Sequence, residues 1–205
     1  MKSISKTMVL LLALTLLTPA MVSAKGNQGA KGNTGPAVVV ELSPEDESTL
    51  LWMREEEKLA RDVYLAMDKT WKQQVFRNIA NSEQNHIDAL LRKMNTFGID
   101  DLVPLQRGVF YSSELQELYD ILVAKGNESY VGALKVGATI EDLDIYDLKV
   151  AIEATNNVAL KTTYESLLEG SKNHLRSFIG LLQQQGEDYK PQYIDEVLFD
   201  AIINE

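Results

Sequence analysis

The chain has two histidines, His86 and His174, and both stand among carboxylates in segments with helical periodicity. Glu83 lies three residues before His86, so these two side chains share one face of a helix. A carboxylate on a core-facing side must be paired or bind a cation, because burying an unpaired charge is costly. Carboxylate oxygen and imidazole nitrogen are ligands that iron, manganese and zinc accept. These residue types at these spacings predict a buried site for a divalent metal.

Four long segments each carry at least one such residue inside an otherwise apolar helical stripe. The first segment contributes Glu57, and the second contributes Glu83 and His86. Glu141 interrupts the stripe of the third segment, and His174 interrupts that of the fourth. The predicted metal ligands are therefore Glu57, Glu83, His86, Glu141 and His174, with Asp144, one helical turn beyond Glu141, as a further candidate.

A hydrogen-bonded polar network without metal is the alternative explanation for these inward groups. A single Glu-x-x-His occurs often by chance, so the metal prediction depends on both histidines falling at core positions. We expect Glu55 and Glu56 to face solvent, although Glu56 would replace Glu57 as a ligand if the first helix were rotated. Tyr64 and Tyr164 are expected to be core aromatics whose hydroxyls have hydrogen-bond partners.

The elements that must position these residues are helices. Ser43 followed by Pro44 is a strong helix start, with serine as the N-cap and proline at the first helical position. No segment from residue 43 onward alternates like a half-buried strand. The predicted fold is an all-α bundle of four long helices, with a short extra helix after the second long helix and a short C-terminal helix. Long helices are expected at 44–68, 72–97, 129–155 and 158–185, short ones at 113–126 and 191–203, and a loop at 98–112.

An internal similarity supports this arrangement. Residues 82–87 parallel residues 170–175 when the two stretches are aligned on their histidines. In both stretches an asparagine precedes the histidine and an aliphatic residue follows it. Two helix pairs related in this way are typical of a ferritin-like bundle.

The first 24 residues have the pattern of a signal peptide. Lys2 and Lys6 form a basic start, an apolar run covers residues 8–17, and small residues at 22–24 offer a cleavage point. We therefore expect export to a periplasmic, cell-surface or extracellular location, with an uncleaved anchor as the alternative. Residues 25–42 read as a flexible Gly-rich linker, since their four glycines at every third position are too few for collagen. The helical domain is expected to span 43–205.

Composition excludes several classes of protein. The 205 residues include no cysteine, so disulfides, thiolate metal sites and iron–sulfur clusters are excluded. The net charge of −10 would become −12 after loss of Lys2 and Lys6 with the signal peptide. Such an acidic chain is not expected to bind nucleic acid or, once cleaved, a membrane surface. The charge is compatible with attracting cations, and equally with solubility alone.

The motifs also resemble a known family. Residues 57–64 are similar to the first-helix signature of rubrerythrin-like proteins, and residues 76–86 resemble the second-helix signature that ends in Glu-x-x-His. Glu141 followed by Tyr146 resembles the third helix of these proteins. Over residues 43–185 the chain resembles most the uncharacterised ferritin-like family called domain of unknown function 2202 (DUF2202). The stretches that carry this resemblance are 54–64, 82–86, 140–145 and 171–175.

The resemblance implies a di-iron centre in which two helices give a glutamate and two give Glu-x-x-His. This chain has Ser171 where the fourth helix should carry its glutamate, although Asp144 could compensate in part. One ion or an asymmetric pair is therefore as consistent with the sequence as a symmetric di-iron centre. The expected roles are bridging or flanking for Glu83 and Glu141, and terminal for Glu57, with a histidine capping each side.

These observations predict an exported ferritin-like metal-binding protein, with iron preferred and manganese or zinc as alternatives. A non-haem iron or manganese oxidoreductase acting on oxygen, peroxide or ferrous iron is the favoured activity. It would need an external electron donor, since no cysteine can hold an iron–sulfur cluster. The alternative from another class is a non-catalytic interaction protein whose bundle contains a polar network and no metal. Homo-oligomers fit either reading, but the sequence offers no evidence for the interfaces of a storage cage.

Overall fold

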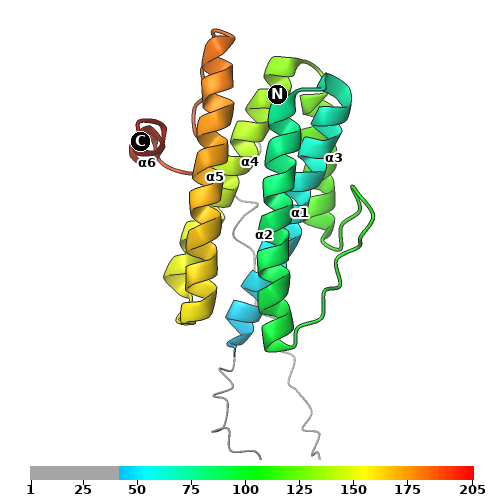
Figure 1. The fold of residues 1–205 in the computed structure, drawn as a ribbon, viewed down its shortest axis with the longest axis vertical. Helices are drawn as coiled ribbons and strands as arrows, with labels where there is room; N and C mark the ends of the chain where they lie inside the picture. The colour runs from blue at the N-terminus through cyan, green and yellow to red at the C-terminus, as the bar shows by residue number, and fades with distance from the viewer. Residues whose placement is uncertain (1–41) are drawn as a thin grey trace, which may run out of the picture. The chain divides into compact units, whose positions relative to one another are not determined.

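The computed structural model describes residues 42–205, and within this range the chain forms six α-helices and no strand (Figure 1). The predicted signal peptide and all but the last residue of the predicted linker lie outside the described residues. No helix in the described part is long and apolar enough to cross a membrane. The helices are α1 (Pro44–Trp71), α2 (Gln74–Phe97), α3 (Ser113–Gly126), α4 (Tyr130–Ala154), α5 (Val158–Gln184) and α6 (Glu196–Ile203).

Four long helices form a bundle in which each packs against two neighbours. Helix α1 contacts α2 and α4, and helix α5 contacts the same two helices from the other side. Two residues separate α1 from α2, and three separate α4 from α5, so each of these pairs is a helical hairpin (Figure 1). Helix α3 packs on α1 and α4, while α6 contacts α5. The all-α prediction and the four long helices with two short ones are confirmed.

The core consists of two apolar clusters with a polar layer between them. One cluster contains Leu50 and Met53 of α1, and the other contains Leu59 and Val63 of the same helix. The polar residues of α1 lie between these pairs, and α2 and α5 repeat the pattern, while in α4 Glu141 and Asp144 lie just before Ile145, the last α4 residue buried in the second cluster. Along α1 and α5 the order of the clusters is the reverse of that along α2 and α4. All four neighbouring pairs in the bundle are therefore antiparallel.

Helix boundaries follow local capping. The Ser43 hydroxyl accepts a hydrogen bond from the Asp46 amide at 3.0 Å, as expected for an N-cap. Helix α1 continues past its predicted end at Asp68 and stops where Lys72 adopts a left-handed conformation, with φ of 53°. Helix α2 stops at Gly98, whose φ of 73° favours glycine.

The C-terminal helix begins five residues later than predicted, at Glu196. The buried carboxylate of Asp142 accepts hydrogen bonds from the backbone amides of Gln192, Tyr193 and Ile194. These contacts hold residues 192–194 in a turn, and the Asp195 side chain then caps α6 by accepting from the amide of Leu198. The late start of α6 therefore depends on a contact with α4 that the local sequence does not show.

The prediction that Glu55 and Glu56 face solvent is wrong. Both are buried, Glu55 under the 98–112 loop and the start of α3, and Glu56 against α4. Glu55 accepts hydrogen bonds from the backbone amides of Tyr111 and Ser112 at the start of α3. Glu56 lies against Asp144 and Asp147 of α4. The consecutive glutamates 55–57 of α1 are therefore buried against different neighbours.

Candidate metal centre

Polar side chains from the four long helices meet in the layer between the two apolar clusters. All of them are less than one-tenth exposed. The structure brings together every residue predicted as a ligand, including the further candidate from α4. The layer comprises Glu57 of α1, Glu83 and His86 of α2, Glu141 and Asp144 of α4, and Ser171 and His174 of α5.

Glu83 connects the two histidines. Its Oε2 lies 2.8 Å from Nδ1 of His86, and its Oε1 lies 2.9 Å from Nδ1 of His174. The two imidazole rings are stacked, with centroids 5.6 Å apart. A carboxylate that presents one oxygen to each of two imidazoles has the form of a bridge, and it can serve two cations at once.

Glu57 and Glu141 complete two sets of three residues around this bridge. Glu57 Oε2 lies 3.2 Å from Nδ1 of His86, and Glu141 Oε2 lies 3.4 Å from Nδ1 of His174. In each set, one potential ligand atom per residue lies within 4.8 Å of the others. Only Glu83 belongs to both sets. Glu141 therefore flanks the centre as Glu57 does, and does not bridge it.

Ser171 and Asp144 fill the place where a second bridging carboxylate would be expected. The Ser171 hydroxyl donates to Asp144 Oδ2 at 2.5 Å, and it also contacts the Leu167 carbonyl at 3.0 Å. Asp144 Oδ1 is buried without a hydrogen-bond partner among the described residues. Burial and the negative charges of Glu57 and Glu141 raise the pKa of Asp144 well above its ordinary value. A cation in the layer would relieve this repulsion.

The charges of the layer are strongly coupled. Burial by itself would lower the pKa of His86, but Glu57 and Glu83 outweigh it and raise that pKa to about 12. In the same way, Glu83 and Glu141 outweigh burial and raise the pKa of His174 to about 11. Burial would raise the pKa of Glu83, yet the two histidines lower it to about 2. Without metal both imidazoles are protonated at neutral pH, so a bound metal must displace a proton from each.

The outer carboxylates of the layer behave differently from Glu83. Burial raises the pKa of Glu57 to about 7, with His86 opposing the rise and Glu83 adding to it. Burial and the charge of Glu83 also raise the pKa of Glu141, although His174 opposes them. The two imidazolium groups neutralise only two of the four carboxylate charges in this small volume. The remaining carboxylates therefore repel one another, which favours their protonated forms.

Several buried atoms of the layer have no hydrogen-bond partner within residues 42–205. The approach of Glu83 Oε1 to His174 Nδ1 is an ion pair without hydrogen-bond alignment, so both atoms remain unpartnered. Glu57 Oε1 and Asp144 Oδ1 are unpartnered as well. Native proteins rarely leave buried polar atoms in this state, so each one needs an explanation such as an ion.

The sequence did not identify two residues beside the layer, Asp147 and Ser82, nor a third buried residue, Lys58, which faces the 98–112 loop. Lys58, one residue after Glu57, is 1% exposed although it is a charged residue. Asp147, which burial gives a pKa of about 6, lies beside Glu56 next to the layer. Ser82 places its hydroxyl oxygen 2.9 Å from Nε2 of His174. Only Ser82 had a signal in the sequence, because it stands within the stretch that parallels residues 170–175.

The two core tyrosines differ in their hydrogen bonding. The Tyr64 hydroxyl donates to Glu141 Oε1 and also lies 3.4 Å from the Gly137 carbonyl, as expected for a satisfied core aromatic. The Tyr164 hydroxyl is buried without a partner in the described part of the chain, so the expectation was wrong there. Tyr64 therefore helps to orient a residue of the centre, whereas Tyr164 lies in the adjoining apolar cluster.

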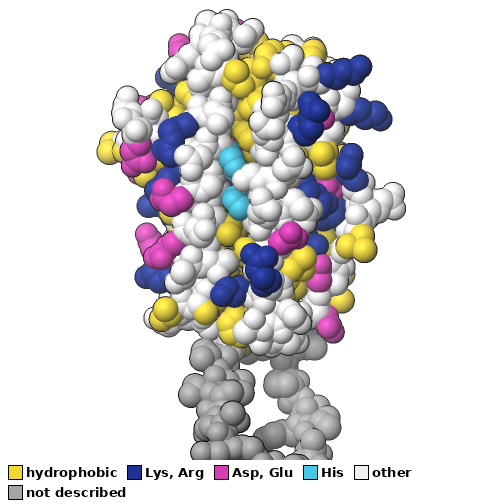
Figure 2. All heavy atoms as spheres, in the orientation of Figure 1, with side chains coloured by type: hydrophobic (Ala, Val, Ile, Leu, Met, Phe, Trp, Pro, Cys, Tyr) yellow, Lys and Arg dark blue, Asp and Glu magenta, His cyan; other side chains and the backbone are white. Residues whose placement is uncertain are grey.

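The centre comes close to the surface between α2 and α5. The histidine side chains are visible from outside as one small patch on this face (Figure 2). His86 retains 11% exposure of its side chain and His174 retains 9%, while Glu83 retains 2%. Small solutes can therefore approach the imidazoles, and the carboxylates lie behind them.

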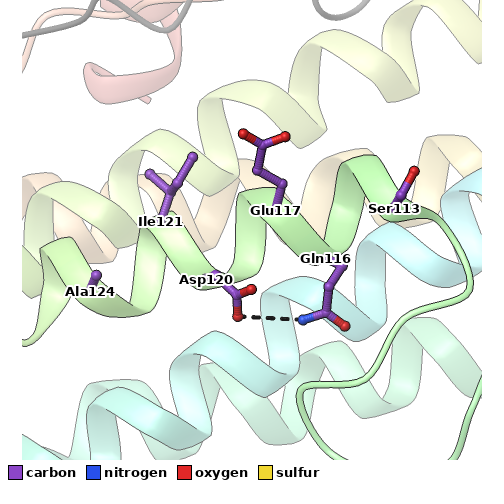
Figure 3. Close-up of a pocket in the computed structure, with 6 residues that line it drawn as sticks. All are labelled: Ser113, Gln116, Glu117, Asp120, Ile121 and Ala124. Carbon is purple, nitrogen blue, oxygen red and sulfur yellow. Dashed lines mark hydrogen bonds between the residues drawn. The ribbon is translucent and has the colours of Figure 1, made fainter.

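A surface pocket of about 490 Å³ lies on α3, away from these residues (Figure 3). It is lined by residues of that helix alone, and Gln116 donates to Asp120 within it at 3.4 Å. None of the predicted ligands contributes to its wall. The residues that line it are Ser113, Gln116, Glu117, Asp120, Ile121 and Ala124.

Comparisons with known proteins agree with the helical fold. Over 164 residues the chain is 49% identical to the uncharacterized protein MJ0754 of Methanocaldococcus jannaschii. The aligned residues cover 80% of this chain and 89% of that protein. The crystal structure of hypothetical protein MJ0754 from Methanococcus jannaschii superposes with a TM-score of 0.79 at 44% identity, covering 89% of this chain and 98% of that one. The model of an uncharacterized protein domain, DUF2202, matches residues 46–205. The chain therefore belongs to the DUF2202 family.

Proposed function

We propose that this protein is an exported, ferritin-like metal-binding protein that holds two divalent cations bridged by Glu83. The observation that carries the proposal is the position of Glu83, whose two oxygens lie 2.8 and 2.9 Å from Nδ1 of His86 and His174. One cation would be held by Glu57, Glu83 and His86, and the other by Glu83, Glu141 and His174. Asp144 is the candidate for an additional oxygen ligand in place of the glutamate that Ser171 replaces.

The residues present fit a divalent transition metal. Unpartnered buried atoms on Glu57, Glu83, Asp144 and His174 are available as donors. Mixed carboxylate and imidazole ligation suits iron, manganese and zinc, and it disfavours calcium and magnesium, which take oxygen ligands. Iron is the preferred occupant because the motifs resemble those of rubrerythrin-like proteins. A single ion on one side of Glu83 is the minimal version of the proposal.

The activity that such a centre supports is non-haem oxidoreductase chemistry on oxygen, peroxide or ferrous iron. A pair of iron or manganese ions, when bound, supplies sites that change oxidation state. The chain itself would hold the ions against one another through Glu83 and keep solvent from the carboxylates, which are 1–2% exposed in Glu57, Glu83 and Glu141. Reducing equivalents would come from an external donor, because the chain has no cysteine for an iron–sulfur cluster.

A metal-free polar network is the second candidate, and one observation favours it. The protonated histidines neutralise part of the carboxylate charge, through four ion pairs of 2.8 to 3.4 Å. In that case the protein would be a non-catalytic interaction module. This version leaves two buried atoms, Glu57 Oε1 and Asp144 Oδ1, without a hydrogen bond or an ion pair, and for that reason we prefer the metal centre.

Metal analysis of protein purified under mild conditions tests the proposal. The wild-type chain should carry up to two equivalents of iron, manganese or zinc, and the double variant Glu83→Ala with His86→Ala should carry less than half of that. A matched control is Lys135→Ala with Glu187→Ala, which removes an exposed ion pair of 2.6 Å and should keep the full metal content. Full retention of metal by the Glu83 and His86 variant would refute the metal centre.

A further inference from the structure

The two halves of the centre differ in how their ligands are supported, although their ligands are alike. Each half has its own histidine and its own outer glutamate, and both share Glu83. In the half that contains His174, the Ser82 hydroxyl lies 2.9 Å from Nε2 of the imidazole, and Tyr64 donates to Glu141. Both unshared ligands of this half are thus held by a second residue.

The half that contains His86 lacks such support. Nε2 of His86 has no hydrogen-bond partner among residues 42–205, and the only side-chain contacts of its Nδ1 are with Glu57 and Glu83. The Glu57 Oε1 atom is also unpartnered. Neither unshared ligand of this half is oriented by a residue outside the centre.

The difference has a structural origin in the parallel between α2 and α5. In each helix, the residue four positions before the histidine faces the histidine of the other helix. Ser82 of α2 reaches His174, whereas its counterpart Gly170 of α5 lies against His86. A Cβ atom at Gly170 would be 2.5 Å from Nε2 of His86, so the imidazole occupies the space of any side chain there. Close packing at this point therefore excludes a hydrogen-bonding residue.

Second residues of this kind matter for metal affinity. A hydrogen bond at the remote nitrogen of a ligating histidine fixes its tautomer and ring orientation, and its loss costs about 10- to 100-fold in affinity. Donation from Nε2–H to Ser82 leaves Nδ1 of His174 free to take a metal. No second residue hydrogen-bonds Nε2 of His86, which lies against Gly170 of α5. The side chain of His86 is also slightly more exposed than that of His174.

We propose that the two metal positions are unequal and fill in order, with Ser82 as the positioning residue that makes the His174 position the tighter one. This inference deepens the proposed function and rests on it. The His174 position is the permanent one, and the His86 position is where an ion is gained and lost. A cargo or substrate ion would therefore pass through the His86 side.

Titration of the metal-free protein with Co²⁺, followed by calorimetry and visible absorption, tests this. The wild-type chain should bind two ions in steps separated by about 10-fold or more. His86→Ala should retain the tight step, and His174→Ala should retain only the weak one. Ser82→Ala should weaken the tight step by about 10-fold and leave the weak step unchanged, and Ser82→Thr should restore it.

Ser177→Ala is the matched control, because its hydroxyl contacts only the Asn173 carbonyl of its own helix. It should leave both steps as in the wild type, and metal-free Ser82→Ala should still unfold cooperatively. Two equal steps in the wild type, or a Ser82→Ala effect confined to the weak step, would overturn the inference while leaving the metal centre intact. A wild-type chain that binds no Co²⁺ would instead refute the proposed function, and this inference with it.

Discussion

Helix α1 contributes to two clusters of buried polar residues, and these clusters differ in one respect. The first, here called the loop clasp, consists of Glu55, Lys58 and Asp62 and ties α1 to the 98–112 loop. The Lys58 ammonium donates to Asp62 at 2.6 Å and to two carbonyls of the loop at 3.0 Å each. The second is the candidate metal centre, to which α1 contributes Glu57.

The difference lies in which polar atoms have partners. In the loop clasp every side-chain nitrogen and oxygen of the three residues has one, and Asp62 also accepts from Arg61 and from the Gly108 amide. In the centre four buried atoms have none within the described residues. Burial of charge alone therefore does not identify a site. A satisfied cluster holds the fold together, whereas an unsatisfied cluster of carboxylates and imidazoles could hold a cation.

The largest expected effect comes from breaking the loop clasp. Asp62→Ala leaves the Lys58 ammonium buried without its carboxylate and removes the acceptor of the Gly108 amide. Breaking one side of a buried ion pair destabilises by about 3–5 kcal/mol. Urea unfolding should show this loss, while the folded fraction keeps its metal content. Asp188→Ala, at an exposed position, should change stability by less than about 0.5 kcal/mol. A loss below 1 kcal/mol would show that the clasp is not structural.

Removing metal should have the next largest effect. Ions that bind only the folded state stabilise it by about 2.7 kcal/mol at 100 times the dissociation constant. A domain of this size shifts its melting temperature by about 2–4 °C per kcal/mol, so chelation should lower it by about 5–10 °C. Calorimetry with and without chelator measures the shift, and Glu83→Ala with His86→Ala should abolish it. An unchanged melting temperature of metal-loaded wild-type protein would favour the metal-free network.

The pH dependence should reverse between the metal-free and metal-bound protein. The pKa values of His86 and His174 are raised to about 12 and 11, so their ion pairs stabilise fully below about pH 6.5, where the unfolded chain is also protonated. As pH rises from 6.5 towards 11, this contribution is progressively lost. Metal binding has the opposite slope, because it displaces these protons. Between pH 6.5 and 9 the melting temperature should therefore fall without metal, and stay constant or rise with metal. Parallel curves would contradict the assignment of the two histidines as metal ligands.

The bundle and the inward position of the five candidate ligands could be predicted because both follow from local periodicity. A glutamate or histidine inside an apolar stripe, as at Glu83 and His86, must face the core if the helix forms. The burial of Glu55 could not be predicted this way, since it depends on amides at the start of α3, more than 50 residues away. The same applies to Asp142, which stops α6 from starting early. Contacts of this kind are set by the tertiary fold and leave no periodic trace.

The adjacent residues Glu56 and Glu57 of α1 allow the most local comparison between two buried carboxyl groups. Both are buried, and rotation of α1 in the sequence-based prediction would have exchanged their roles. Glu57 contacts His86 at 3.2 Å, whereas Glu56 faces Asp147 and Asp144 and touches neither histidine. Burial, followed by the charges of Asp147 and Asp144, raises the pKa of Glu56 well above its ordinary value, which favours its neutral form.

Glu56→Gln keeps the shape of the side chain and removes an acid that burial and its carboxylate neighbours already bias towards the neutral form. Stability should change by no more than about 0.5 kcal/mol, and the metal content should stay the same. Glu57→Gln should instead lose one equivalent of metal, because the amide nitrogen offers no lone pair and the ligand charge disappears. Metal analysis and urea unfolding of the two variants side by side distinguish these outcomes. If Glu56→Gln lost the metal and Glu57→Gln kept it, the centre would lie one residue around α1, towards Asp147, and Glu83 would not be its bridge.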